Sequence, residues 1–365
     1  MQLFLVILLL VMAAILLFMR QPKFGKMPTG QRLQRIKQSP NYRDDAFQNI
    51  HFTPQLTEGA SYIRILGEFL FKKKERMKPM EKVPSIKTDL HHLPQDNDIL
   101  VWFGHSSYFM QVDGKKILVD PVLSGSASPL PGGTKAFLGT DIYKPVDIPA
   151  IDILFITHDH WDHLDYQTMK ELQSKIKKVV CPLGVGEHLE YWGFPTNSIE
   201  EKDWGDQVDL GEGFKATLTP ARHFAGRTFK RNVSLWTSYV LQTPTLKIYM
   251  GGDSGYDTHF SEIGNKYGPF DLAIIENGQY DKSWRYIHLL PEEFVMVARE
   301  LDAKKILPVH SSKFGLGNHP WDEPLKKVSE NARLAGLNLV TPMIGEPVYI
   351  KDDQQQFSKW WETVR

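Results

Sequence analysis

The chain has 365 residues, enough for one large domain or two modest ones, and 42% of them are hydrophobic, which suits a globular core. Its 43 basic and 43 acidic residues give a formal net charge of zero, which argues against general binding to nucleic acid. The single cysteine, Cys181, excludes an internal disulfide framework, and its apolar neighbours favour a buried thiol over a nucleophile.

Residues 1–20 form an apolar segment that predicts a membrane anchor. No charged residue and no helix breaker interrupts residues 3–19. A helix of that length is roughly 26 Å long, enough for a thin bilayer. A cleaved signal peptide is the alternative, but no basic residue precedes the apolar run and no small-residue cleavage site follows it. We therefore expect a single-pass N-terminal membrane helix.

Residues 21–98 predict a basic juxtamembrane segment and an N-terminal extension. Six basic residues follow the apolar run before the first acidic residue: Arg20, Lys23, Lys26, Arg32, Arg35 and Lys37. By the positive-inside rule, this charge places the body of the chain in the cytoplasm, with these cations against anionic headgroups. Residues 61–71 have a helical apolar pattern, which favours a packing helix over a membrane-surface element. The charge run at residues 72–78 predicts a solvated helix end.

From residue 99 onward, short apolar segments alternate with helical patterns, and Asp113-Gly114 predicts a hairpin turn. Strands are expected at residues 99–103, 108–112, 116–120, 151–157, 177–181, 207–210, 214–218, 235–242, 246–250, 272–275 and 305–308. Helices are expected at residues 166–175, 184–192, 291–301 and 324–335. This order predicts an α/β domain at residues 99–350, with two sheets face to face and helices outside, and a C-terminal tail at residues 351–365.

The sequence His-Asp-His-Trp-Asp-His at residues 158–163 directly follows a predicted buried strand. Imidazole and carboxylate groups are ligands that a borderline ion such as zinc prefers. Four ligands from six consecutive residues crowd one ion but suit two, with His158 and His160 on one ion and Asp162 and His163 on the other. A solvated loop rich in histidine is the alternative, and the tandem spacing after a strand argues against it.

Three more ligand candidates follow predicted strands. His223 follows the strand at residues 214–218, and His310 follows the strand at residues 305–308. Asp253 follows two glycines, which allow close backbone approach, and its carboxylate can bridge two cations. Each residue alone would be an ordinary loop residue, but beside the motif at residues 158–163 each favours a metal ligand.

These motifs resemble those of the metallo-β-lactamase superfamily, and within it the N-acyl-phosphatidylethanolamine-hydrolysing phospholipase D branch. The similarity extends from about residue 100 to residue 319 and includes Trp-Phe-Gly-His-Ser-Ser at 102–107, Asp-Pro-Val-Leu-Ser at 120–124, Pro-Ala-Arg-His-Phe at 220–224 and Gly-Gly-Asp-Ser-Gly-Tyr at 251–256. The resemblance implies a metallo-β-lactamase-type αββα sandwich of two mixed sheets flanked by helices, with metals at one edge between the sheets.

The resemblance divides the ligand candidates between two divalent ions, expected to be Zn²⁺: His158, His160 and His223 on one, Asp162, His163 and His310 on the other, and Asp253 bridging both together with a solvent-derived hydroxide. One cation lowers the pKa of bound water from 15.7 toward about 7, and a pair can clamp both attacking and leaving oxygens. No serine or cysteine nucleophile is needed.

Further residues are expected around the metals. Asp162 and His288 are the predicted catalytic residues, and His288 would bind a phosphate oxygen or protonate the leaving alkoxide. A structural role at a helix N-terminus is the alternative for His288. Asp120 and Asp165 would orient ligand histidines through their free ring nitrogens. His105 would approach the site, although an ordinary structural role suits it and Asp120 as well.

One fold can host many different activities, so the fold alone does not identify the substrate. Asp253 argues against β-lactamase activity, because true β-lactamases generally lack this bridging aspartate, and no nucleic-acid clamp domain is apparent. The resemblance and the anchor predict a membrane-anchored phospholipase D-type phosphodiesterase that cleaves N-acyl-phosphatidylethanolamine-like lipids by metal-hydroxide attack on phosphorus. The alternatives are a hydrolase of a small soluble ester, lactone or cyclic phosphodiester, and an inactive metal-loaded binding or scaffold protein.

Overall fold

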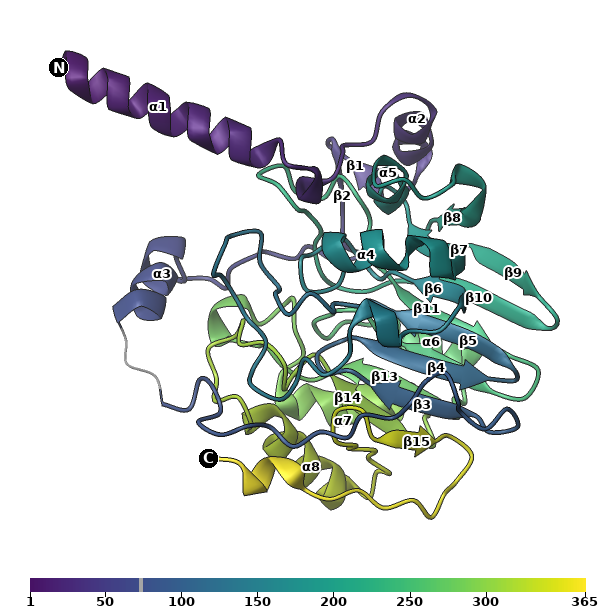
Figure 1. Cartoon of the computed structure of the whole chain (residues 1–365). Helices are drawn as coiled ribbons and strands as arrows, with labels where there is room; N and C mark the ends of the chain where they lie inside the picture. Colours follow the sequence, from purple (N-terminus) through teal and green to yellow (C-terminus); the bar gives the residue numbers. More distant parts are fainter. Residues whose placement is uncertain (72–74) are drawn as a thin grey trace.

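The computed structural model describes residues 1–71 and 75–365, so part of the charge run predicted at residues 72–78 lies outside the described residues. Two β-sheets face each other, and helices cover the outer face of each (Figure 1). The seven-stranded sheet has the order β15-β3-β4-β5-β6-β7-β8, and the six-stranded sheet has the order β14-β13-β12-β11-β10-β9. Both contain parallel and antiparallel pairs, so the predicted sandwich of mixed sheets is confirmed.

The strands of the larger sheet are β3 (Ile99–Trp102), β4 (Tyr108–Val112), β5 (Lys115–Val119), β6 (Ile151–Phe155), β7 (Ile176–Pro182), β8 (Ile199–Lys202) and β15 (Pro347–Tyr349). Those of the smaller sheet are β9 (Gln207–Gly211), β10 (Phe214–Thr219), β11 (Ser238–Gln242), β12 (Lys247–Met250), β13 (Leu272–Glu276) and β14 (Ile306–Val309). β11 begins three residues later than predicted, and β8 and β15 were not predicted.

The core lies in two layers because side chains alternate along each strand. In β3, Leu100 and Trp102 join the large cluster between the sheets, whereas Ile99 and Val101 join the cluster beneath the helices. The helices over the larger sheet are α4 (Tyr166–Leu172) and α5 (Val185–Tyr191), and those over the smaller sheet are α6 (His259–Tyr267), α7 (Pro291–Glu300) and α8 (Glu323–Ala335). Short 3₁₀ helices occupy Pro22–Phe24, Pro145–Asp147, Gln173–Lys175, Thr196–Ser198, Lys282–Trp284 and Trp360–Thr363.

The segments on either side of the domain pack against it. In the N-terminal extension, α2 (Gly30–Gln38), β1 (Tyr42–Arg43) and β2 (Ala46–Phe47) bury Ile36 and Phe47 in a small cluster. Arg32 of α2 binds the carboxylates of Glu187, Glu190 and Glu201 at 2.7, 2.6 and 2.8 Å. The segment predicted as a C-terminal tail buries two tryptophans at residues 360–361 in the main core, so it is part of the folded unit.

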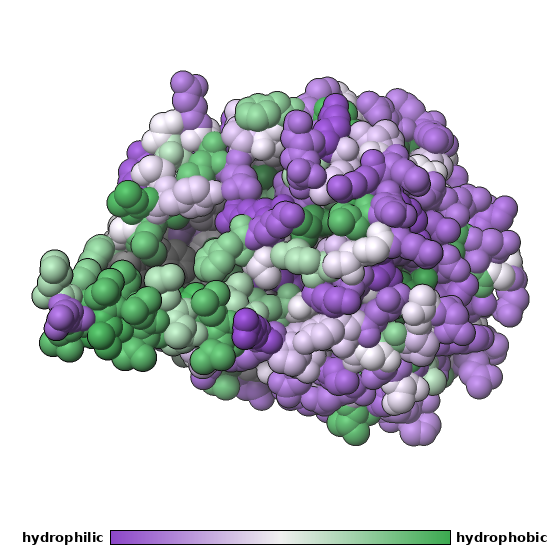
Figure 2. Space-filling model, turned by 90° about the horizontal axis from the view of Figure 1, so that it is seen from above, coloured by the Kyte–Doolittle hydropathy of each residue, from purple (hydrophilic) through white to green (hydrophobic). Residues whose placement is uncertain are grey.

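Two helices project from one end of the molecule (Figure 1). The helix α1 (Gln2–Met19) has no buried residue; among the described helices it alone is long and apolar enough to cross a membrane, and a signal sequence would meet the same criteria. α3 (Tyr62–Phe71) was predicted to pack, but Tyr62 and Leu66 are exposed, so that prediction is wrong for these side chains. Figure 2 shows hydrophobic residues gathered at this same end.

The end of α1 contacts the loop that carries the histidine motif. The ring of Phe24 packs edge-on against Phe18 of α1 and against Trp161, with centroid distances of 5.3 and 5.2 Å. The guanidinium of Arg227 stacks over the other side of this junction, 3.9 Å from the Trp161 ring centroid, and donates to the carbonyl oxygens of Lys23, Asp159 and Leu164. The apolar helix is therefore joined to this loop by packed side chains.

Candidate metal centre

Four strand ends bring the seven predicted ligands to one edge of the sandwich. The loop at residues 158–163 follows β6, and His223, Asp253 and His310 follow β10, β12 and β14. Among the described residues, ligand atoms at this edge fall into three overlapping groups, in each of which all atoms lie within 4.8 Å of one another. The first group contains His158, His160, His223 and Asp253, the second contains His105, Asp162, His163 and His310, and the third contains Asp253, His288 and His310.

The first group has the spacing of ligands around one ion. The Nδ1 atom of His160 lies 3.0 Å from His158 Nε2 and 3.2 Å from His223 Nε2. Asp253 Oδ2 lies 3.6 Å from His223 Nε2 and 3.9 Å from His158 Nε2. Ligands bound tetrahedrally at about 2.0–2.1 Å lie roughly 3.3–3.4 Å apart, so these four atoms fit a single ion such as zinc.

Asp253 also faces the second group. Its Oδ1 atom lies 3.1 Å from His163 Nε2 and 3.0 Å from His310 Nδ1, and Asp162 Oδ2 lies 3.6 Å from His163 Nε2. Among the described residues, His163 Nε2, Asp253 Oδ1 and His310 Nε2 are buried and make no well-formed hydrogen bond, although the first two lie within ion-pair distance of each other. Unpaired buried polar atoms are costly, and a cation between them would remove the cost.

The electrostatics favour neutral imidazoles at most of these positions. Burial, followed by the charge of neighbouring histidines, lowers the pKa of His158, His223 and His310 well below the usual value. Neutral imidazole is the form that binds a metal ion. Although burial opposes it, the carboxylates of Asp253 and Asp162 raise the pKa of His163. The donor set therefore fits two cations that share Asp253 and offset these carboxylates.

Neighbouring groups fix the orientation of the ligands. Asp120 accepts a hydrogen bond from His163 Nδ1 at 2.8 Å, and its other oxygen accepts from the Thr157 backbone N–H at 2.8 Å. The carbonyl of Ile287 accepts from His223 Nδ1 at 2.9 Å. Each bond occupies one ring nitrogen and leaves Nε2 turned toward the cluster, as a metal ligand requires.

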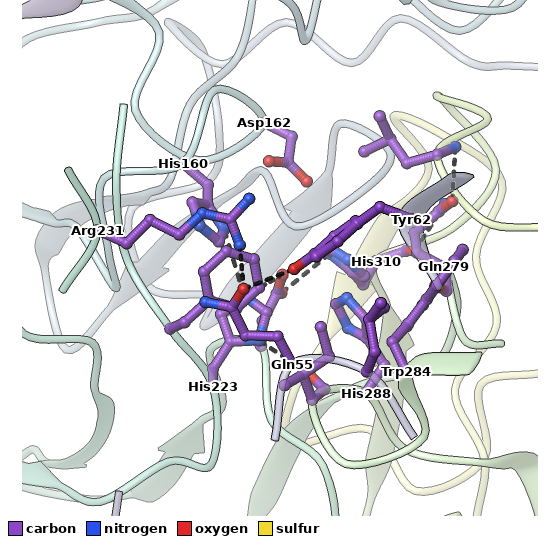
Figure 3. A pocket seen from close by; sticks show the side chains of 15 residues that line it. Gln55, Tyr62, His160, Asp162, His223, Arg231, Gln279, Trp284, His288 and His310 are labelled. Atoms are coloured by element: carbon purple, nitrogen blue, oxygen red, sulfur yellow. Dashed lines mark hydrogen bonds and ion pairs between the residues drawn. The ribbon is translucent and has the colours of Figure 1, made fainter. Parts of the chain in front are cut away.

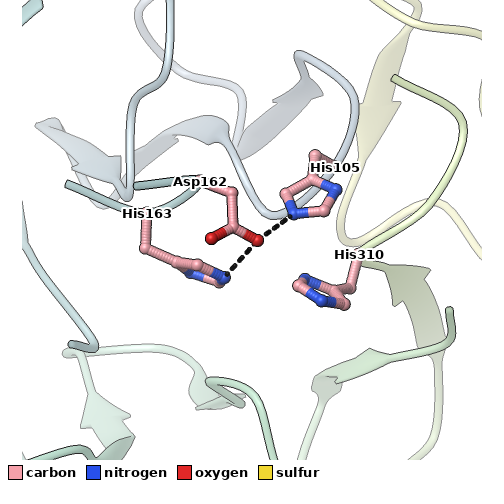
Figure 4. Close-up of side chains that lie close together, drawn as sticks. All are labelled: His105, Asp162, His163 and His310. Atoms are coloured by element: carbon pink, nitrogen blue, oxygen red, sulfur yellow. Dashed lines mark hydrogen bonds and ion pairs between the residues drawn. The ribbon is translucent and has the colours of Figure 1, made fainter. Parts of the chain in front are cut away.

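His105 contacts Asp162, whereas Asp165 has a different role from the predicted one. His105 Nε2 donates to Asp162 Oδ2 at 2.9 Å (Figure 4). Asp165 caps α4, where its carboxylate accepts from Gln167 N at 3.3 Å and from Ser124 N at 3.0 Å. A short carboxylate ahead of a helix satisfies free backbone N–H groups, so Asp165 shapes the loop after the ligands instead of orienting a histidine.

Three residues of the site have left-handed backbone conformations that glycine usually adopts. The φ angles of His105, Asp120 and His310 are +53°, +39° and +68°. Such conformations are costly for residues with a Cβ, and they persist where surrounding contacts hold them. The sequence contains no signal for them, because each position carries a side chain that the site uses.

Glu276 was missed by the sequence analysis. It ends β13, and its Oε2 atom accepts from His288 Nδ1 at 2.8 Å. Its Oε1 atom accepts from the backbone N–H groups of Leu289 and Ser254 at 2.8 and 3.1 Å. Burial raises the pKa of Glu276 well above its usual value. A charged residue at the end of the apolar segment at residues 272–275 was the available signal.

A cavity of about 260 Å³ opens over the ligands (Figure 3). His288 lines it beside ligand side chains, and its apolar wall consists of Leu56, Phe224, Trp284, Ile287 and Leu316. At its mouth, Gln55 Oε1 accepts hydrogen bonds from Tyr62 Oη at 2.7 Å and from an Arg231 guanidinium nitrogen at 2.5 Å. The arrangement can therefore hold a polar group against the candidate ligands and apolar groups against the wall.

The sequence matches the Beta-lactamase superfamily domain over residues 115–311, more than half of the chain. The chain belongs to this superfamily. A relative from Mycobacterium tuberculosis that carries the name of an uncharacterized protein is 33% identical over 329 residues, covering 89% of this chain and 88% of its own. The N-acyl-phosphatidylethanolamine-hydrolyzing phospholipase D 1 of Caenorhabditis elegans is 32% identical over 269 residues, covering 67% of this chain and 74% of its own. The predicted family and branch similarity are confirmed, and the protein is a metal-dependent hydrolase of the β-lactamase superfamily.

Two solved structures share the fold. Igni18, a metallo hydrolase from Ignicoccus hospitalis, has a TM-score of 0.52 at 22% identity, covering 69% of this chain and 97% of its own. CmlA, a diiron β-hydroxylase from Streptomyces venezuelae, has a TM-score of 0.54 at 19% identity, covering 70% of this chain and 55% of its own. At these sequence identities the comparison shows a shared architecture and does not identify the substrate.

Proposed function

We propose that the protein is a membrane-anchored phosphodiesterase of the phospholipase D type, acting on N-acyl-phosphatidylethanolamine-like lipids with two divalent metal ions. The main support is the geometry around Asp253, whose two oxygens face two separate groups of ligand atoms. A bridging carboxylate suits a pair of cations, and a pair suits a phosphodiester because it can hold both attacking and leaving oxygens. The similarity to the C. elegans phospholipase D supports the substrate class.

The ligands would be divided as the family resemblance implies: His158, His160 and His223 on one ion, Asp162, His163 and His310 on the other, and Asp253 on both. When bound, the ions supply Lewis acidity toward the phosphodiester and activation of water. Zinc suits this donor set. The diiron CmlA has the same fold, so metal analysis has to decide between zinc and iron.

His288 is the proposed acid or phosphate-binding residue. It lines the cavity, and Glu276 holds its Nδ1 atom, so Nε2 is the ring atom left for the substrate. There it would donate to a phosphate oxygen or give a proton to the departing alcohol. Water adds to phosphorus, the bond from phosphorus to the headgroup oxygen breaks, and the products are phosphatidic acid and an N-acylethanolamine. Asp162, as both ligand and cavity-lining group, would position the reacting phosphate.

The membrane is part of this proposal. α1 would be a single-pass anchor, and the basic residues that follow it would keep the hydrolase domain on the cytoplasmic side. The proposed units are the anchor at residues 1–20, the extension at 21–98, the hydrolase domain at 99–350 and the C-terminal segment at 351–365. A Klebsiella pneumoniae relative named Outer membrane protein RomA is 54% identical over 106 residues, covering 29% of this chain and 80% of its own.

The cavity volume favours a second candidate function. At about 260 Å³, the cavity is slightly smaller than the roughly 300–1,000 Å³ typical of small-molecule sites. This size suits a small soluble ester, lactone or cyclic phosphodiester, which the same metal centre would hydrolyse. A lipid, in contrast, needs only its headgroup and the start of one acyl chain inside.

The test is phospholipid turnover by the purified full-length protein, with metal analysis and product mass analysis. We expect two metal ions per chain and release of N-acylethanolamine and phosphatidic acid. The variant Asp253→Asn should lose both the full metal content and the lipid hydrolysis. Diacylglycerol as product would move the cleavage to another bond. Turnover confined to soluble substrates would establish the second candidate, and bound metal without hydrolysis of any substrate would indicate a binding or scaffold protein.

A further inference from the structure

Exposed apolar side chains occur on three separate segments that also contribute residues to the lining of the cavity. On α3, Ile63 and Leu66 are 86% and 59% exposed, and they share a face because they are three residues apart. Phe52 and Phe229, on two other segments, are 89% and 85% exposed. Single exposed apolar residues are ordinary on protein surfaces, but a gathered set marks an interaction surface.

One oxygen atom joins these three segments. Gln55 Oε1 accepts hydrogen bonds from Tyr62 of α3 and from Arg231, and Gln55 and Arg231 lie three and two residues from Phe52 and Phe229. Tyr62, Gln55 and Arg231 also line the cavity (Figure 3). The exposed apolar side chains therefore lie within a few residues of three hydrogen-bonded groups that line the cavity.

We propose that α3 and the segments around Phe52 and Phe229, the entrance surface, dock on the lipid bilayer and seat the cavity mouth against it. α1 and α3 project from the same end of the molecule, and hydrophobic residues gather there (Figures 1 and 2). A bilayer entered by α1 therefore faces the entrance surface. This inference deepens the proposed function, resting on its membrane anchor and not on its substrate.

The flanking charges fit the headgroup region of a bilayer. Phe229 precedes Lys230 and Arg231, and Arg64 lies between the exposed Ile63 and Leu66. Apolar side chains next to cations are typical of segments that lie in a membrane interface, with the rings and aliphatic groups below the phosphates. From there an acyl chain reaches the apolar wall of the cavity without passing through water.

The single native cysteine allows a direct test on the full-length chain. Cys181 is buried, so an environment-sensitive fluorophore will label an introduced cysteine selectively. Labels at Ile63→Cys, Leu66→Cys and Phe229→Cys are read in vesicles of phosphatidylcholine and phosphatidylglycerol that carry a quencher on the acyl chains. Leu334→Cys on α8 is the matched control, because this leucine is 69% exposed at another part of the surface.

We expect strong lipid-dependent quenching at positions 63, 66 and 229 and none at 334. Leu9→Cys in α1 reports insertion of the anchor separately. The proposal is overturned if the label at position 9 is quenched while the labels at 63, 66 and 229 behave like the control. Shielding of these labels without quenching by lipid shows that a second copy covers the surface and also overturns it. Quenching at 63, 66 and 229 without quenching at 9 supports docking of the entrance surface on the bilayer and shows that α1 is not inserted.

A kinetic measurement separates docking from folding. The double variant Ile63→Ser/Leu66→Ser is expected to raise KM for vesicle substrate about tenfold, since two side chains lose part of their immersion in lipid. Turnover of a soluble phosphodiester should not change. An equal loss of activity on the vesicle substrate and on the soluble substrate would indicate damage to the fold. If the labels are also unquenched, the docking role is refuted. If the wild-type protein hydrolyses no lipid, the proposed function fails while the quenching result stands.

Discussion

Replacing Glu276 with glutamine tests whether His288 acts through the carboxylate that holds it. Glutamine keeps one acceptor oxygen, and that oxygen will stay on the Leu289 and Ser254 backbone N–H groups that Glu276 Oε1 now accepts from. The new amide NH₂ then faces His288 Nδ1, 2.8 Å away in the present structure. Two donors cannot share this bond, so His288 has to turn or change its tautomer, and Nε2 presents a different group to the substrate.

The expected cost follows from this one bond. Removing the partner that orients a histidine in a site of this kind typically costs about 10–100-fold. We therefore expect kcat to fall about 10–100-fold, or about 1.4–2.7 kcal/mol, with a smaller change in KM. Glu293→Gln is the matched control. Glu293 caps α7 by accepting from Leu290 N at 2.9 Å, a bond that glutamine can keep, so activity should remain near that of the wild type.

The assay is steady-state hydrolysis of N-acyl-phosphatidylethanolamine by Glu276→Gln, His288→Gln, the double variant and the control. Because Glu276 acts through His288, the double variant should be no slower than His288→Gln alone. Additive losses, or full activity of Glu276→Gln with intact metal content, would refute the reasoning. Parallel unfolding measurements exclude a general loss of stability as the cause.

Three further predictions concern metal retention and stability. Asp120→Asn should weaken metal binding about 10–100-fold, because His163 loses the carboxylate that orients it; unchanged binding in a metal titration would contradict this. Arg32→Met should lower the free energy of unfolding by about 1.5–3 kcal/mol, because the buried carboxylates of Glu187 and Glu201 lose the guanidinium that they share and keep only Lys26 and Arg35, whereas the half-exposed Arg35→Met should cost about 1 kcal/mol or less; equal losses in denaturant would contradict this. Burial lowers the pKa of His259 to about 3, so the unfolded chain binds more protons below pH 6.5 and stability falls as the pH falls toward 3. Between pH 7 and pH 4, His259→Gln should therefore lose less stability than the wild type, by up to about 3 kcal/mol, and parallel pH curves would contradict this.

The ligand candidates were accessible to sequence analysis because each follows an apolar strand, and such a pattern is local. The unpredicted elements lack a local pattern: β8 has the sequence Ile-Glu-Glu-Lys, and β15 has three residues at a sheet edge. In α6, Gly264 weakens the helical signal, yet it is needed, since a Cβ there would lie 1.7 Å from the Glu300 carbonyl oxygen of α7.

Other features depend on contacts between distant segments. Glu276 meets His288 only because β13 and the segment before α7 converge, and His105 reaches Asp162 across 57 residues. No spacing rule predicts such pairs. The exposure of α3 was missed for a different reason. Its apolar pattern correctly predicts a helix, but such a pattern does not say whether the apolar face contacts protein or another apolar phase.

The contact between Phe24 and Trp161 limits how freely the hydrolase domain can move relative to α1. Trp161 lies between the ligand candidates His160 and Asp162 in the sequence. The ring of Phe24 alone lies between it and Phe18 in the last turn of the helix. A flexible tether would let a catalytic domain sample many heights above a membrane. With α1 inserted as proposed, this packed junction would hold the domain at one height, and the accessible substrates would be those whose scissile bond lies at one depth.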